Sequence, residues 1–182
     1  GLPGKAMAVC MSRRICVDLY SEIIALRPEW HSEDDEKGAV KIVMTGSASD
    51  PEAWQPHIGG KARRDLLAKR AKDPSDDLKL VIVRDMWLTG FDAPSMHTMY
   101  VDKALSGIKA VQTLSRLNRA HPKKSDVFVL DFHNDTKIIE DSFADYYRTT
   151  ILSSATDPDK LHTLKGQLDK HQVYAPEQVD AL

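Results

Sequence analysis

Five short apolar runs, separated mostly by stretches of helical pattern, constrain the fold of this chain more than any other feature. The runs occupy residues 5–10, 40–44, 78–83, 96–101 and 127–132. Strands that alternate with helices are typical of βαβ units. Because the runs are largely apolar on both faces, we expect helices to cover both sides of the sheet they form. The pattern therefore predicts an α/β fold with a parallel sheet and flanking helices.

The two clearest helical patterns lie in the first half of the chain. Apolar residues recur at helical spacing from Ile15 to Leu26, and Pro28 ends that helix. Residues 61–72 form a basic amphipathic pattern with Leu66 and Leu67 directed inward. We expect its basic residues to point mostly outward; these are Lys61, Arg63, Arg64, Lys69, Arg70 and Lys72. The sequence leaves open whether they bind phosphates or form a solvated face.

The character of the chain changes after the fifth run. Residues 137–152 and 157–171 both have helical patterns, the second with Leu161, Leu164 and Leu168 on one stripe. We place a boundary near Ser153. Residues 1–152 are thus expected to form the α/β domain, and residues 153–182 the start of a helical region.

Composition favours an ordinary globular protein without identifying a ligand. The chain has 25 Lys and Arg against 27 Asp and Glu, a net charge of −2, which still permits a local basic stripe. No apolar run approaches the length of a membrane span. Cys10 and Cys16 have no metal-binding or redox spacing, so we expect reduced thiols in the cytoplasm.

The loop after the first run is one of three that should lie at the carboxyl ends of strands, where open parallel sheets bind ligands. Ser12, Arg13 and Arg14 stand there at a helix N-terminus. A hydroxyl, free backbone N–H groups and two guanidinium groups can hold a phosphate. Taken alone, the segment is better explained by Ser12 as a simple N-cap with solvated arginines.

The loop after the third run contains Thr89, Gly90 and Asp92. The hydroxyl and the unobstructed backbone N–H suit a nucleic-acid phosphate, and the carboxylate suits a ribose hydroxyl or an arginine. Trp87 and Phe91 in the same loop could stack on bases, although large aromatic residues more often anchor a loop to the core.

A third group of polar residues lies in a helical pattern covering residues 108–118. Gln112, Arg116 and Arg119 are spaced i, i+4 and i+7, which places them on one face of a helix. Arginine binds phosphate through two N–H groups and stabilises charge on a transferred phosphoryl group. A solvated basic face is the alternative, but the register with the other two loops favours a polyphosphate site.

The order of these three segments resembles motifs IV, V and VI of superfamily 2 helicases. Residues 89–94 (TGFDAP) match motif V, and Gln112-x-x-x-Arg116-x-x-Arg119 matches motif VI. The amino-acid sequences of residues 41–50, 80–94 and 96–102 are similar to those of the motor (R) subunit of type I restriction enzymes. Many helicases have glycine before the first motif VI arginine, where this chain has Ser115.

The resemblance implies a second RecA-like lobe of an ATP-dependent DNA translocase. It implies that Arg119 is the arginine finger, that Arg116 is its partner at the γ-phosphate, and that Gln112 orients the nucleotide or the attacking water. Asp92 and Gly90 are then expected to approach ATP. The residues expected to contact the DNA backbone are Ser12, Arg13, Thr89 and Gly90.

Other parts of such a motor are missing from the sequence. Gly59-Gly60-Lys61 is followed by Ala62, so there is no Walker A motif, and we find no Walker B segment or nuclease site. We expect the chain alone to be inactive and ATP and Mg²⁺ to be bound by a full-length motor. The expected partners are double-stranded DNA, a first RecA-like lobe and nuclease domain of the same subunit, and modification and specificity subunits, in a bacterial or archaeal cytoplasm.

Two alternatives remain open at this point. One is another superfamily 2 DNA helicase or remodelling motor. The other is a non-catalytic nucleic-acid-binding domain that has the same fold.

Overall fold

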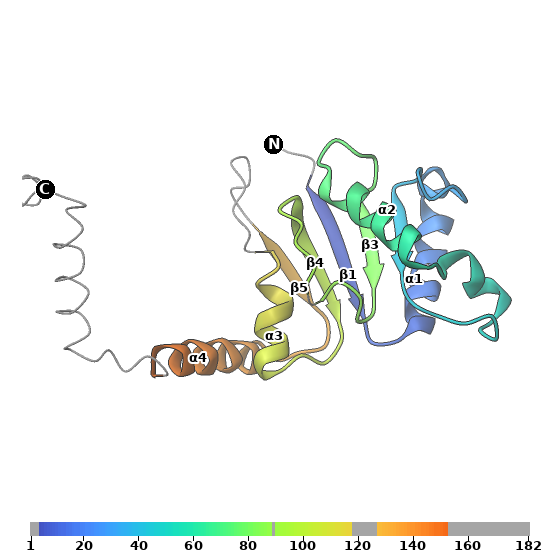
Figure 1. The fold of residues 1–182 in the computed structure, drawn as a ribbon. Coiled ribbons are helices and arrows are strands. Elements are labelled where there is room, and N and C mark those ends of the chain that lie inside the picture. Colours follow the sequence, from blue (N-terminus) through green and yellow to red (C-terminus); the bar gives the residue numbers. More distant parts are fainter. Residues whose placement is uncertain (1–3, 89, 118–126, 153–182) are drawn as a thin grey trace, which may run out of the picture. The chain divides into compact units, whose positions relative to one another are not determined.

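A five-stranded sheet forms the centre of the protein (Figure 1). The computed structural model describes residues 4–88, 90–117 and 127–152, with side chains up to residue 146. The strands are β1 (Lys5–Cys10), β2 (Val40–Val43), β3 (Leu80–Val83), β4 (Met96–Asp102) and β5 (Phe128–Asp131). Their order is β2-β3-β1-β4-β5, and every neighbouring pair is parallel. This confirms the predicted parallel sheet.

Helices cover both faces of the sheet because successive side chains of a strand point to opposite sides. Ala8 and Cys10 of β1 pack with residues of α1 (Arg13–Leu26). Met7 and Val9 face the other way, into a cluster that includes residues of α2 (Lys61–Lys72) and α3 (Gly107–Leu114). A five-stranded parallel sheet enclosed in this way is a RecA-like α/β fold.

The remaining elements are short connections and one longer helix. Two 3₁₀ helices, η1 (Pro28–Trp30) and η2 (Glu52–His57), flank β2 in the sequence. Helix α4 (Thr136–Leu152) follows β5. The chain divides into a compact unit Gly1–Phe143 and a second unit Ala144–Leu182, and everything discussed below lies in the first. Among the described helices, none is long and apolar enough to cross a membrane.

Strand β5 differs from the expectation that the strands are buried on both faces. Its apolar side chains are exposed, and Phe128 is 55% accessible. β5 lies at the end of the strand order and pairs only with β4, so it has a neighbour on one side only.

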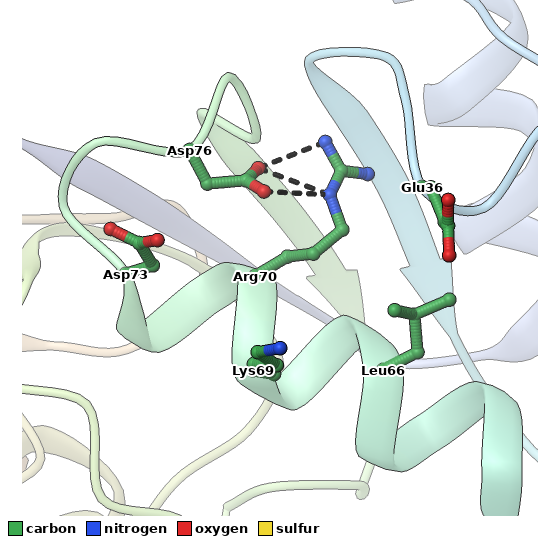
Figure 2. A pocket seen from close by; sticks show the side chains of 6 residues that line it. All are labelled: Glu36, Leu66, Lys69, Arg70, Asp73 and Asp76. Atoms are coloured by element: carbon green, nitrogen blue, oxygen red, sulfur yellow. Dashed lines mark hydrogen bonds and ion pairs between the residues drawn. The ribbon is translucent and has the colours of Figure 1, made fainter.

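The expectation that the basic residues of α2 point mostly outward is wrong for two arginines. The side chain of Arg63 is 11% exposed and that of Arg70 only 5%. Arg63 donates to Asp35, and Arg70 donates to both carboxylate oxygens of Asp76 at 3.0 and 3.1 Å (Figure 2). Arg70 also donates to the carbonyls of residues 35, 37 and 38. The helix thus fastens the loops that precede β2 and β3.

A pocket of about 280 Å³ lies beside Arg70 and is lined by Glu36, Leu66, Lys69, Arg70, Asp73 and Asp76 (Figure 2). It lies next to the segments that lead into β2 and β3, at the amino-terminal edge of the sheet. Parallel sheets bind ligands at the opposite edge. The charged lining is explained by the ion pair between Arg70 and Asp76, so we interpret this pocket as structural.

Candidate functional site

The carboxyl-terminal edge of the sheet brings together the loops that follow β1, β2, β3 and β4. At the end of β1, Ser12 has an extended backbone and its Oγ accepts a hydrogen bond from Ile15 N at 3.2 Å. Ser12 is therefore the N-cap of α1, the simpler of the two interpretations of the sequence. Its contact with DNA stays a prediction.

Arg13 is held by the loop that follows β2. Its Nη1 and Nη2 donate to the two carboxylate oxygens of Asp50 at 2.7 and 3.0 Å, and Nη1 also donates to the carbonyl of Thr45 at 3.2 Å. The guanidinium lies 5.0 Å from the centre of the Trp54 ring. The hydrogen bonds from Arg13 keep the pKa of Asp50 below its usual value. A fork-to-fork pair of this kind fixes the guanidinium in one orientation.

Two more cationic residues connect the loops after β1, β3 and β4. Arg84 Nε donates to the carbonyl of Met11 at 3.3 Å. Lys103 donates to the carbonyl of Arg84 at 3.0 Å and pairs with the carboxylate of Asp85. The hydrogen bond from Lys103 lowers the pKa of Asp85. These contacts hold the start of the loop at residues 84–94 against its neighbours.

The aromatic residues of the loop at residues 84–94 anchor it to the core. The rings of Trp87 and Phe91 stack with centroids 4.1 Å apart and planes at 10°, and both pack against the larger hydrophobic cluster. Gly90 is exposed with φ +73, a left-handed conformation that glycine adopts at little cost. Asp92 is also exposed, and Thr89 lies outside the described residues.

Arg116 joins the segment after α3 to this loop. Its Nε donates to the carbonyl of Leu88 at 3.2 Å and its Nη1 to that of Phe91 at 2.7 Å. The predicted helix through residue 118 is too long, since α3 ends at Leu114 and Arg116 lies in the following turn. Gln112 is exposed on α3, and Arg119 lies outside the described residues. The structure therefore joins Arg116 to this loop by two hydrogen bonds, while Gln112 lies exposed on α3.

Sequence reasoning missed several residues that shape this edge, including Asp50, Arg84 and Lys103. It also missed Asn134, whose Oδ1 accepts from Leu105 N at 2.7 Å and whose Nδ2 donates to the carbonyl of Lys103 at 2.8 Å. All four lie at or after the carboxyl end of a predicted strand. Their position at the carboxyl end of a strand is the feature of the sequence by which these four residues could have been found. Over the described residues, no group of three or more His, Cys, Asp or Glu could hold a metal ion.

The fold and the polar carboxyl-terminal edge define a RecA-like α/β lobe, and comparison with known proteins gives the family. Residues 59–134 match the model described as "Type I restriction enzyme subunit R domain 3". The type I restriction enzyme HindI endonuclease subunit of Haemophilus influenzae is 59% identical over 121 residues, 66% of this chain and 12% of that protein. The putative type I restriction enzyme MjaIXP endonuclease subunit of Methanocaldococcus jannaschii is 42% identical over 130 residues, 71% of this chain and 12% of that protein.

This chain belongs to the family of type I restriction enzyme R subunits. It spans about 12% of the length of these two relatives. Among solved structures, the C-terminal part of the Fun30 ATPase domain aligns with a TM-score of 0.47 and 14% identity, over 78% of this chain and 38% of that one.

Proposed function

We propose that the chain is the second motor lobe of an ATP-dependent DNA translocase, within the R subunit of a type I restriction enzyme. The observation that supports this best is the pair of hydrogen bonds from Arg116 to the carbonyls of Leu88 and Phe91. These bonds connect the segments that resemble motifs V and VI. The segment that resembles motif V is proposed to contact DNA, and the segment that resembles motif VI is proposed to contact ATP.

The chemistry of the arginines fits the phosphate chain of ATP. Arg116 is already oriented by two carbonyl groups, so its remaining N–H groups would reach a phosphate with little further loss of side-chain freedom. We assign the arginine finger to Arg119, three residues on, and the orientation of the attacking water to Gln112. Gly90 and Asp92 would approach the nucleotide from the neighbouring loop.

The residues for Mg²⁺ are expected elsewhere. The described part of the chain contains no suitable cluster of carboxylates, and the sequence has no Walker A motif. We therefore assign Mg²⁺ and the β-phosphate to a first RecA-like lobe of the same subunit. Closure of the two lobes would then bring Arg119 to the γ-phosphate. The modification and specificity subunits are the other proposed partners.

The DNA backbone is assigned to the loops after β1 and β3. Ser12 and Arg13 lie at the N-terminus of α1, where backbone N–H groups favour a phosphate. Thr89 and Gly90 belong to the loop that Arg116 holds. A nucleic-acid strand along this edge would therefore lie beside the residues proposed to act on ATP.

The test is the Arg119→Ala variant of a full-length R subunit that contains this sequence. An arginine finger contributes about 10³- to 10⁵-fold to turnover, so DNA-stimulated ATP hydrolysis should fall by that factor while DNA binding is kept. Arg27→Ala is a matched control, because the Arg27 side chain is 65% exposed and forms a long surface ion pair with Glu29. Unchanged turnover in Arg119→Ala would exclude the finger and favour a non-catalytic nucleic-acid-binding domain.

A further inference from the structure

The resemblance implies that Arg13 contacts a DNA phosphate, yet both of its Nη atoms already donate to groups of the protein, and its side chain is 35% exposed. Two of them face the Asp50 carboxylate, and Nη1 also serves the carbonyl of Thr45. One face of the guanidinium lies over Trp54. A phosphate that took both Nη atoms would have to displace the Asp50 carboxylate, so the guanidinium is oriented toward the loop at residues 45–58.

Asp50 organises the loop at residues 45–58 from its other side. The same Oδ2 that faces Arg13 accepts a hydrogen bond from Ser47 N at 2.8 Å. Gln55 Nε2 donates to the carbonyls of Ser47 at 3.1 Å and Asp50 at 2.8 Å. These bonds tie Ser47, Asp50 and Gln55 together, and Arg13 joins them to the N-terminus of α1. The rings of Tyr20 and His57, with centroids 4.6 Å apart, make a second contact between α1 and this loop.

Exposed polar groups lie on both of the segments that Arg13 joins. The side chain of Arg14 is 78% exposed, and its ion pair with Asp18 is long, at 3.6 Å. Ser47 and Ser49 are exposed, and their hydroxyl groups lie 2.8 Å apart. Arg14 thus offers a cation at the N-terminus of α1, and Ser47 and Ser49 offer hydroxyl groups on the loop that Arg13 holds. Both kinds of group suit a sugar–phosphate backbone.

We propose that Arg13 is a positioning residue that holds the loop at residues 45–58 through Asp50. The backbone contact at this corner is then made by Arg14 and by the loop. The inference rests on the proposed DNA-binding function of this edge. It differs from that proposal in the role of Arg13 and in assigning Arg14, Ser47 and Ser49 to the contact.

The substitution Asp50→Asn separates the two roles of Arg13, measured as DNA affinity of the full-length subunit over a series of salt concentrations. If Arg13 positions the loop, Asp50→Asn weakens binding by about three- to tenfold, and Arg13→Lys combined with it adds little. The slope of affinity against salt stays unchanged in both. If Arg13 binds a phosphate directly, Asp50→Asn frees it and tightens binding, and Arg13→Ala lowers the slope by about 0.9. That second result overturns the inference.

Arg14→Ala is the matched variant on the neighbouring residue. It should lower the salt slope by about 0.9 without changing hydrogen exchange in the loop at residues 45–58. Asp50→Asn should instead accelerate exchange there, starting at Ser47 N. Faster exchange with unchanged DNA affinity would overturn the inference while leaving the motor function standing, because that function is tested separately by Arg119→Ala turnover.

Discussion

Replacing Arg70 by methionine should be among the most damaging changes to the stability of this protein. The residue is 4% exposed, and its guanidinium serves Asp76 and the carbonyls of residues 35, 37 and 38. Removing one partner of a buried ion pair costs about 3–5 kcal/mol because the other charge stays behind without compensation. Since the Asp76 side chain is 22% exposed, we expect the lower end, about 3 kcal/mol.

Urea unfolding of the chain, followed by circular dichroism, measures this loss. With a slope of about 1–3 kcal/mol per M urea, a loss of about 3 kcal/mol lowers the urea midpoint by about 1–3 M. Lys69→Met is the control, because Lys69 is the exposed neighbour on the same helix and its loss should cost less than about 0.5 kcal/mol. If Arg70→Met and Lys69→Met unfold at the same urea concentration, the role given to Arg70 in fastening the loops before β2 and β3 is refuted.

Two further predictions concern pH and backbone strain. Burial, with Arg63 and Lys41 nearby, lowers the pKa of His57 to about 4. An unfolded histidine has a pKa near 6.5, so the unfolded state binds the proton first and stability falls as pH drops from about 6.5 to 4. After a discount for the partial exposure of His57, the free energy of unfolding should fall by about 1–2 kcal/mol over this range. This fall should be absent in His57→Asn. If the stabilities of the wild type and of His57→Asn change with pH in parallel, the prediction is contradicted. Gly90→Ala should cost about 1 kcal/mol by thermal unfolding, because φ is +73 while, apart from its chain neighbours, no atom of the described residues lies within 4 Å of the added Cβ. Gly90→Asn should cost less, and equal costs would refute the strain argument.

Hydrophobic pattern predicted the five strands and four described helices because burial dictates which residues repeat at strand or helix spacing. It does not predict α2 correctly, because two of the charged side chains that it places in solvent are at most 11% exposed. Arg63 and Arg70 face inward because their carboxylate partners, Asp35 and Asp76, come from loops outside the helix. Such partners depend on tertiary packing and cannot be read from helical periodicity.

The candidate site shows the same limit at α3. Helical spacing continues through Arg119, but the helix ends at Leu114 and the backbone tightens into i→i−3 bonds, from Arg116 N to Thr113 O and from Leu117 N to Leu114 O. In that turn, Arg116 reaches the carbonyls of Leu88 and Phe91. Spacing identified Arg116 as a functional candidate but could not predict the carbonyls it binds.

The most direct test of the central claim is DNA translocation by the complete restriction complex with Arg119→Lys in the R subunit. The substitution keeps the positive charge but removes the planar fork that an arginine finger needs. Translocation is measured as ATP-dependent displacement of a third strand from a DNA triplex placed downstream of the recognition site. We predict that the variant binds DNA like the wild type but displaces no third strand. Displacement at the wild-type rate would contradict the proposed function of this lobe.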